Sequence, residues 1–417
     1  MNIAEARRYS DMLEHLLQSL TAYPEDRFQG RGIVICGGGN YYFPCVWVCI
    51  RMLRSVGCTL PIELWHRGPH EMTEEMKALI EPWGVDCRDA FAVAQQHPVH
   101  RLDGWELKPY AIMHSRFAEV LSIDADNVVV RDPAFLFDTD LYQHTGALFW
   151  PDFPGHTSSP WYLKKEAWEV LGVPFRQEPE FESGQLVIDK RRCWRPLQLT
   201  LHLNEHSDYY YAFFYGDKDT FHLAWRKVGR EYSMIPHQPA TLADDRALVQ
   251  FDPAGNRLFQ HRCNAKWTLN ERNVRLPGFL FEELCLAFLH ELRTMSLRSL
   301  NACPIVSTPE EQVVFKEIVR TRTFRSCSDG QKNGVCVFTA DLVVTLNDES
   351  RNAESLGWQT AVDKDGKAVL IVTHLCRPMC FLRKSPDGSW KGRWRMSQQR
   401  PWIELWPQYE SPDSERI

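Results

Sequence analysis

Apolar runs alternate with amphipathic segments near the start of the chain, and this alternation constrains the fold more than any other feature. Apolar runs at 32–36, 60–65 and 85–88 have the length of strands. Between them, segments at 43–56 and 73–83 carry apolar residues at helical spacing. Strands and helices that alternate at this spacing are typical of βαβ units, whose strands are parallel. We therefore predict an α/β fold with a mostly parallel sheet, whose loops after the strands share one edge.

The composition of the chain changes at about residues 301–309. Beyond this point short β-rich runs dominate, and Asp387-Gly388 is a hairpin-turn signal between two of them. A length of 417 residues also favours more than one domain. We predict an N-terminal helix within 1–30, an α/β domain at 31–300 and a small β-rich domain at 305–417.

Charge and cysteine content exclude some classes of protein. The 48 basic and 54 acidic residues give a net charge of −6, which disfavours a nucleic-acid partner. The 13 cysteines are spread along a long chain, which favours reduced thiols over a disulfide scaffold. No stretch approaches the ~18 apolar residues of a membrane span. We expect a cytoplasmic protein, and the sequence leaves its oligomeric state open.

Two carboxylates follow a predicted strand at 119–123. Asp124 and Asp126 stand one residue apart, so both side chains can face a shared pocket where the strand ends. Carboxylate oxygens suit Mn²⁺ or Mg²⁺, and such an ion can hold a nucleotide diphosphate while the bond to a sugar breaks. A solvated turn is the alternative interpretation of an Asp-x-Asp triplet.

A second polar cluster begins at His261 and ends at Trp267. A neutral imidazole from His261 can complete a carboxylate-bound metal site, and Lys266 can neutralise a phosphate. An ordinary surface loop is the alternative, because spacing rules say nothing of a pairing between His261 and Asp124 at this separation.

Three further segments contain candidate site residues. Glu182 and Gln185 precede or begin an apolar run at the expected ligand-binding edge of the sheet. Asp217 and Asp219 supply two more carboxylates, for which a helix N-cap is the alternative. The triplet Gly37-Gly38-Gly39 lacks the spacing of a phosphate loop, and it fits better as a tight turn against which a base or ribose lies.

Taken together, these segments resemble the fungal Golgi alpha-mannosyltransferase family, whose members are GT-A glycosyltransferases. The matches occur in family order over about residues 31–290. They are Lys108 to Ile112, Leu121 to Asn127, Arg131-Asp132-Pro133, Leu136-Phe137, Glu182 to Gln185, Asp189-Lys190, Gly216 to Phe221 and His261 to Trp267.

The resemblance implies a GT-A (Rossmann-like) fold and transfer of a hexose with retention of configuration. It implies Mn²⁺ (or Mg²⁺) held by Asp124, Asp126 and His261, and a nucleotide-sugar donor, either GDP-mannose or a UDP-hexose. Catalytic contacts are then expected from Glu182, Gln185, Asp217 and Asp219. Donor contacts are expected from Asp124 again and from Gly37, Gly38, Gly39, Lys108 and Lys266, and the acceptor is a glycan or a protein.

A different function remains open from the residues. The β-rich domain lies outside the resemblance, so the chain can instead be a catalytically silent sugar-binding or scaffold protein that acts through this domain. Its tryptophans Trp390, Trp394, Trp402 and Trp406 alternate with polar residues, which favours one buried sheet face over sugar stacking. A different metal-dependent phosphotransfer enzyme is a further alternative.

Overall fold

A computed structural model describes most of the chain. The described residues are 3–153, 163, 165–243, 246–269, 273–295, 309–321, 323–328, 331–338, 343–347, 355–362, 367–374, 377–394 and 402–408. The chain divides into two compact units, Met1–Met295 (unit 1) and Ser296–Ile417 (unit 2).

Unit 1 is built on a seven-stranded sheet with the order β3-β2-β1-β4-β7-β6-β8. Strand β7 runs antiparallel to both of its neighbours, and the other strands all run in one direction. The strands, in sheet order, are β3 (Val85–Asp89), β2 (Ile62–His66), β1 (Arg31–Cys36), β4 (Glu119–Asp124), β7 (Phe181–Asp189), β6 (Ala147–Pro151) and β8 (Ser233–Met234). The predicted mixed, mostly parallel α/β sheet is therefore confirmed.

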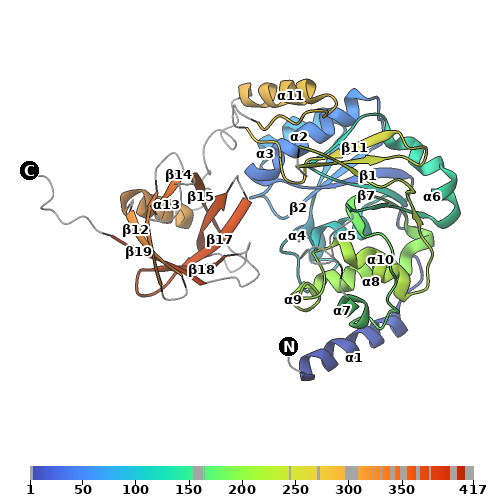
Figure 1. Cartoon of the computed structure of the whole chain (residues 1–417), viewed down its shortest axis with the longest axis horizontal. Helices are drawn as coiled ribbons and strands as arrows, with labels where there is room; N and C mark the ends of the chain where they lie inside the picture. Colours follow the sequence, from blue (N-terminus) through green and yellow to red (C-terminus); the bar gives the residue numbers. More distant parts are fainter. Residues whose placement is uncertain are drawn as a thin grey trace, which may run out of the picture. The chain divides into compact units, whose positions relative to one another are not determined.

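Helices cover both faces of this sheet, so its central strands are buried on both sides. In Figure 1, α2 (Gly39–Ser55) and α11 (Glu282–Thr294) lie on one face, and α5 (Leu107–His114), α8 (Lys190–Glu205) and α10 (Lys218–Lys227) lie on the other. The core of the second face includes Val34, Val120 and Leu186 from the sheet. The remaining helical segments of unit 1 are α1 (Ile3–Ser19), α3 (Glu74–Ile80), η1 (Glu81–Trp83), α4 (Ala90–Ala94), η2 (Pro133–Asp138), α6 (Asp140–Thr145), α7 (Lys165–Glu169) and α9 (Ser207–Tyr210).

A second, four-stranded sheet completes unit 1. Its order is β5-β11-β10-β9, and neighbouring strands are antiparallel. The strands are β5 (Asn127–Val129), β11 (Arg257–His261), β10 (Ala247–Phe251) and β9 (Ala240–Leu242). Because β5 begins close to the end of β4, this small sheet continues directly from the candidate carboxylate pair.

In its described residues, unit 2 contains a closed antiparallel barrel and the helix α13 (Pro309–Thr321). Inside it, Phe324, Phe338, Trp358 and Trp390 pack with Ile318 of the helix. The barrel strands are β12 (Thr323–Ser328), β13 (Gln331–Phe338), β14 (Val343–Asn347), β15 (Ser355–Val362), β16 (Ala368–His374), β17 (Arg377–Lys384), β18 (Trp390–Trp394) and β19 (Trp402–Pro407).

The barrel confirms the predicted hairpin and corrects the interpretation of two tryptophans. Asp387-Gly388 joins β17 to β18, and Gly388 has a positive φ of 82°. Trp390 is fully buried, as predicted, but Trp402 and Trp406 are 39% and 36% exposed. The prediction fails for these two because β19 turns the intervening Ile403 and Leu405 inward instead. The Trp394 side chain lies outside the described residues.

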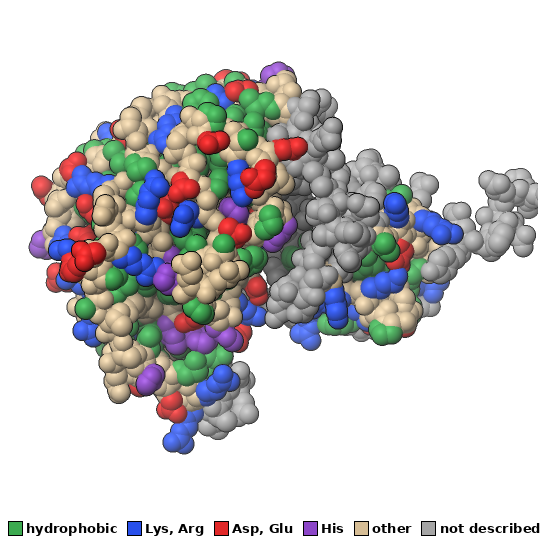
Figure 2. Space-filling model, turned by 180° about the vertical axis from the view of Figure 1, so that it is seen from behind, with side chains coloured by type: hydrophobic (Ala, Val, Ile, Leu, Met, Phe, Trp, Pro, Cys, Tyr) green, Lys and Arg blue, Asp and Glu red, His purple; other side chains and the backbone are tan. Residues whose placement is uncertain are grey.

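The surface of the protein carries charged side chains of both signs, as the small net charge of the sequence predicts. Acidic and basic side chains are interspersed over the face drawn in Figure 2. Among the helices that the structure describes, none has both the length and the apolar character needed to cross a membrane.

Candidate active site

The carboxylate pair lies where β4 ends and the chain turns into β5. Asp124 is the last residue of β4, and Asp126 directly precedes β5. Asp126 is 3% exposed, so it is not the solvated turn residue of the alternative interpretation. A buried carboxylate requires charged or hydrogen-bonding partners, which the following contacts supply.

The glycine triplet after β1 lies beside this turn. Cys36, the last residue of β1, is in register with Asp124. A Cβ on Gly37 would stand 3.3 Å from the Cβ of Ala125, and one on Gly38 would stand 2.8 Å from the carbonyl oxygen of Glu71. The predicted tight turn is thus closely packed against the residue between the two aspartates.

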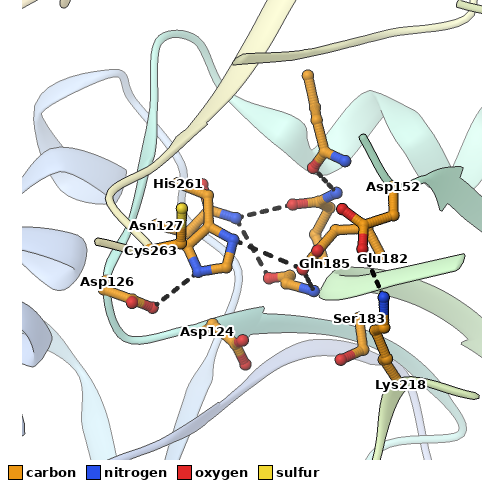
Figure 3. Close-up of polar contacts among 12 residues, drawn as sticks. Asp124, Asp126, Asn127, Asp152, Glu182, Ser183, Gln185, Lys218, His261 and Cys263 are labelled. Carbon is orange, nitrogen blue, oxygen red and sulfur yellow. Dashed lines mark hydrogen bonds and ion pairs between the residues drawn. The ribbon is translucent and has the colours of Figure 1, made fainter. Parts of the chain in front are cut away.

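His261 reaches the carboxylate pair through the second sheet. Strand β11 pairs with β5 so that His261 stands opposite Asn127. His261 Nε2 lies 3.2 Å from Asp126 Oδ1, and its Nδ1 lies 3.5 Å from Glu182 Oε1. Figure 3 shows the imidazole between these two carboxylates. One ligand atom from each of Asp124, Asp126 and His261 lies within 4.8 Å of the others.

Strand β7 brings Glu182 and Gly184 against the imidazole. The backbone N–H of Gly184 donates a hydrogen bond of 2.6 Å to Glu182 Oε1. A Cβ on Gly184 would stand 2.8 Å from both Glu182 Oε1 and His261 Nδ1. Only glycine leaves room for this arrangement. The close approach of the imidazole therefore explains why the Glu182–Gln185 segment contains a glycine.

Two lysines, the buried Lys108 and the half-buried Lys266, balance the aspartates. Lys108 Nζ, from α5, lies 2.9 Å from Asp124 Oδ1 and 3.0 Å from Asp217 Oδ2, and it also donates to the Ser183 carbonyl at 2.9 Å. Lys266 forms an ion pair with the other aspartate, Asp126. The site therefore joins residues from α5, β4, β7, β11 and the N-terminus of α10.

These contacts shift the pKa values of the acids in opposite directions. Burial raises the pKa of Asp124, although Lys108 opposes this shift. Burial also acts to raise the pKa of Asp126, but Lys266 and His261 outweigh it and hold the pKa well below its usual range. For Glu182, His261 likewise outweighs burial and lowers the pKa to about 2. Asp126 and Glu182 are thus fixed as anions around the imidazole, whose own pKa they raise against burial.

Gln185 and Asp219, two of the four expected catalytic residues, do not contact His261 or Lys108 through their side chains in the hydrogen bonds and ion pairs described below. The Gln185 amide donates to Gln250 and accepts a hydrogen bond of 2.8 Å from Asn127, so its side chain is held inside the protein. Asp219 accepts a hydrogen bond of 2.9 Å from the Tyr215 backbone N–H rather than pairing with Lys108. Burial raises the pKa of Asp219 to about 7. Asp217, in contrast, joins the central group through Lys108 and Ser183.

A second group of ion pairs, which the sequence did not indicate, lies beside the site around Lys218. Lys218 Nζ lies 2.6 Å from Asp152 Oδ2 and 3.3 Å from Glu180 Oε2. Burial and the neighbouring Glu182 raise the pKa of Asp152 to about 6. Lys218 lies in the sequence between the candidate site residues Asp217 and Asp219. No pattern in the sequence indicates that its partners are distant acidic residues.

The mostly parallel sheet with one reversed strand, and the Asp-x-Asp pair that meets a histidine after β4, agree with the glycosyltransferase class that the sequence motifs predict. The chain belongs to the family described as "Mannosyltransferase putative", whose model matches residues 30–167 and 175–249. The family predicted from the sequence motifs is therefore confirmed.

Curated relatives of the chain are fungal mannosyltransferases. The alpha-1,2-mannosyltransferase MNN21 of Candida albicans is 27% identical over 264 residues, which cover 51% of this chain and 40% of the relative. MNN2 of Saccharomyces cerevisiae is 25% identical over 271 residues, which cover 55% and 45%. The chain thus spans less than half the length of these relatives.

Solved structures similar to this chain are also glycosyltransferases. The galactosyltransferase LgtC, in complex with donor and acceptor sugar analogs, has a TM-score of 0.40 and 16% identity, with 66% of this chain and 98% of that chain covered. Core-mannan synthase A from Aspergillus fumigatus, in its Mn/GDP form, has a TM-score of 0.33 and 10% identity, with 50% and 72% covered.

Proposed function

We propose that the protein transfers a hexose from a nucleotide-sugar to a hydroxyl group of a glycan or protein, in a reaction that requires a divalent cation and retains configuration. Mannose from GDP-mannose is the first choice, because the chain belongs to a mannosyltransferase family. The observation that carries the proposal is the convergence of Asp124 at the end of β4, Asp126 in the turn after it and His261 in β11.

The residues at this point fit a divalent cation. Two carboxylates and an imidazole are a donor set that suits Mn²⁺, and their ligand atoms lie close enough to share one ion. The other ring nitrogen of His261 faces Glu182, which is the usual support for a metal-bound histidine. When bound, the cation would neutralise charge on the diphosphate of the donor.

The side chains of the protein prepare the rest of the site. Lys108 and Lys266 hold the two aspartates and add positive charge where a diphosphate would lie. Glu182 orients the His261 ring, and Gly184 leaves the space between them. The Gly37–Gly39 turn, packed against Ala125, offers backbone for contact with a ribose or base.

A screen of donors tests this proposal. The purified chain would be incubated with GDP-mannose and with UDP-hexoses, with Mn²⁺ or with EDTA, and release of the nucleotide would be measured. We expect release that requires Mn²⁺ and is fastest with GDP-mannose, and NMR of the product to show an anomeric configuration like that of the donor. Silence with every nucleotide-sugar would reject the proposal, and cleavage of plain nucleotides would indicate a phosphotransfer enzyme instead.

Glycan binding through unit 2 is a second candidate function. It is favoured by Trp402 and Trp406, which are exposed on one strand and donate hydrogen bonds of 3.3 and 3.2 Å to the Glu404 carboxylate between them. Tryptophan rings displayed in this way can stack on sugars. Glycan-array binding that Trp402→Ala abolishes, in a chain silent with all donors, would favour this function.

A further inference from the structure

A second group of metal-binding side chains lies at the end of α8, away from the motifs discussed above. His202, Glu205 and His206 have the pattern His-x-x-Glu-His. Residues three and four positions apart share one face of a helix, so this pattern brings all three side chains together. The same spacing of two histidines is used by helical zinc sites.

The geometry of this group is that of a near-complete metal site. The His202 and His206 ring centroids are 4.6 Å apart, and His202 Nδ1 lies 3.6 Å from Glu205 Oε1. One ligand atom from each of the three residues lies within 4.8 Å of the others. Ligands of one zinc ion lie about 3–4 Å apart, so small side-chain rotations suffice to close the site.

Two buried nitrogen atoms of this group have no hydrogen-bond partner among the described residues. His202 is 7% exposed and His206 is 9% exposed. His202 Nε2 and His206 Nδ1 make no hydrogen bond within the part of the chain that the structure describes. A packed pair of core histidines leaves both nitrogen atoms unsatisfied, which is unfavourable, so these two rings have unused capacity for a ligand.

One residue on the loop before α5 and one residue in α9 extend the group. His100 and Asp208 also have ligand atoms within 4.8 Å of one another and of His206. The backbone N–H of His100 donates a hydrogen bond of 3.2 Å to Glu205 Oε2, so the loop before α5 already contacts this cluster. Figure 2 shows a group of histidine side chains on the face of unit 1 that it draws.

We propose that His202, Glu205 and His206 bind a transition-metal cation of the Zn²⁺ class, with His100 or Asp208 as a further ligand. The imidazole-rich donor set separates this site from the carboxylate-rich group at Asp124, because imidazole suits Zn²⁺ and carboxylates suit Mn²⁺. With His100 as that ligand, bound metal would fasten the loop at His100 to α8. This loop leads into α5, which carries Lys108, so the metal stabilises the segment that positions that lysine.

Metal binding to the full chain tests the proposal. Zn²⁺ would be titrated calorimetrically into Asp126→Asn, which removes a ligand of the first group, and into the same variant with His202→Gln and His206→Gln. His144→Gln, in an exposed part of α6, is the matched control. We expect one equivalent of Zn²⁺ in Asp126→Asn and in the control, and an affinity at least ~10-fold lower in the histidine variant.

A second variant and a spectroscopic measurement keep the result decisive if the buried histidine variant fails to fold. Glu205→Gln changes a half-buried side chain without changing its volume, and it should also weaken Zn²⁺ binding. Co²⁺ in place of Zn²⁺ should give visible absorption bands in Asp126→Asn that Glu205→Gln alters. Absence of Zn²⁺ binding by Asp126→Asn, or unchanged binding in both the histidine and Glu205 variants, would overturn the proposal.

Discussion

His261 Nε2 lies 3.2 Å from Asp126 Oδ1 because β11 pairs with β5, the strand that begins directly after Asp126. The pairing register, with His261 opposite Asn127, fixes the imidazole beside the carboxylate. The main sheet and the turn that follows it supply the two aspartates, and the small second sheet supplies the histidine. Changes at this junction should therefore affect the site more than changes elsewhere on the surface.

Replacement of Lys108 by methionine should destabilise unit 1 strongly. The substitution would leave the buried carboxylate of Asp217 and the half-buried carboxylate of Asp124 without their shared cation, a loss of about 3–5 kcal/mol in the free energy of unfolding. Urea denaturation measures this. Lys77→Met removes a more exposed ion pair with Glu74 and should cost less than about 1 kcal/mol. Equal losses in the two variants would contradict the role of Lys108.

Asp219→Asn should stabilise the protein at alkaline pH. Burial raises the pKa of Asp219 to about 7 from an ordinary 3.8. Between these two values the folded protein holds the proton more tightly than the unfolded chain, so this group's contribution to stability falls as the pH rises and is lowest above pH 7. Asparagine removes the penalty, on the order of 2–4 kcal/mol at pH 8.

Thermal unfolding at several pH values checks this expectation. The stability difference between Asp219→Asn and the wild type should shrink as the pH falls and vanish below about 4, where both side chains are neutral. A difference that does not depend on pH would show that Asp219 is not a buried titrating group.

Gly184→Ala should impair the site while the fold persists. The new Cβ would press against Glu182 Oε1 and His261 Nδ1 and move the imidazole. Disturbing the support of a metal-bound histidine typically lowers metal affinity or activity by about 10–100-fold. Gly104→Ala is the control, because its Cβ would meet only Glu106 Oε2, at 3.4 Å. Mn²⁺ titration of both variants decides, and equal affinities would argue against the proposed support.

Gly392→Ala should destabilise unit 2. A Cβ at this position would stand 2.0 Å from the carbonyl oxygen of Phe381 on the paired strand, so β17 and β18 would have to separate. Overpacking of this kind costs about 1–3 kcal/mol. The near-ultraviolet circular dichroism signal, recorded on heating, follows the packing of Trp390, which lies in β18 with Gly392. An unchanged melting curve would show that the two strands are less tightly joined.

The sequence predicted the parts of the site that depend on local pattern. The strand at 119–123, the carboxylates after it and the glycine turn after β1 all follow from apolar periodicity and the rules for parallel sheets. The resemblance to mannosyltransferases then added His261. Spacing alone could not, since the contact of His261 with Asp126 depends on strand pairing between distant segments.

Burial is what sequence reasoning missed most often. Asp126 follows a predicted strand, where local pattern does not indicate burial, but it is 3% exposed and compensates Lys266. We therefore expect Asp126→Ala to reduce stability as well as activity, and asparagine is the better probe. The exposed Trp402 and Trp406 are the converse case, because alternation does not tell which face of β19 turns inward.

The Mn²⁺ dependence of GDP-mannose turnover in Asp126→Asn tests the central claim most directly. Asp138→Asn, in which an exposed carboxylate pairs only with Arg31 among its described contacts, is the matched control. With both variants folded, we predict that Asp126→Asn loses at least ~100-fold in turnover and most of its Mn²⁺ response, whereas Asp138→Asn keeps the wild-type rate. Wild-type turnover by folded Asp126→Asn would contradict the account.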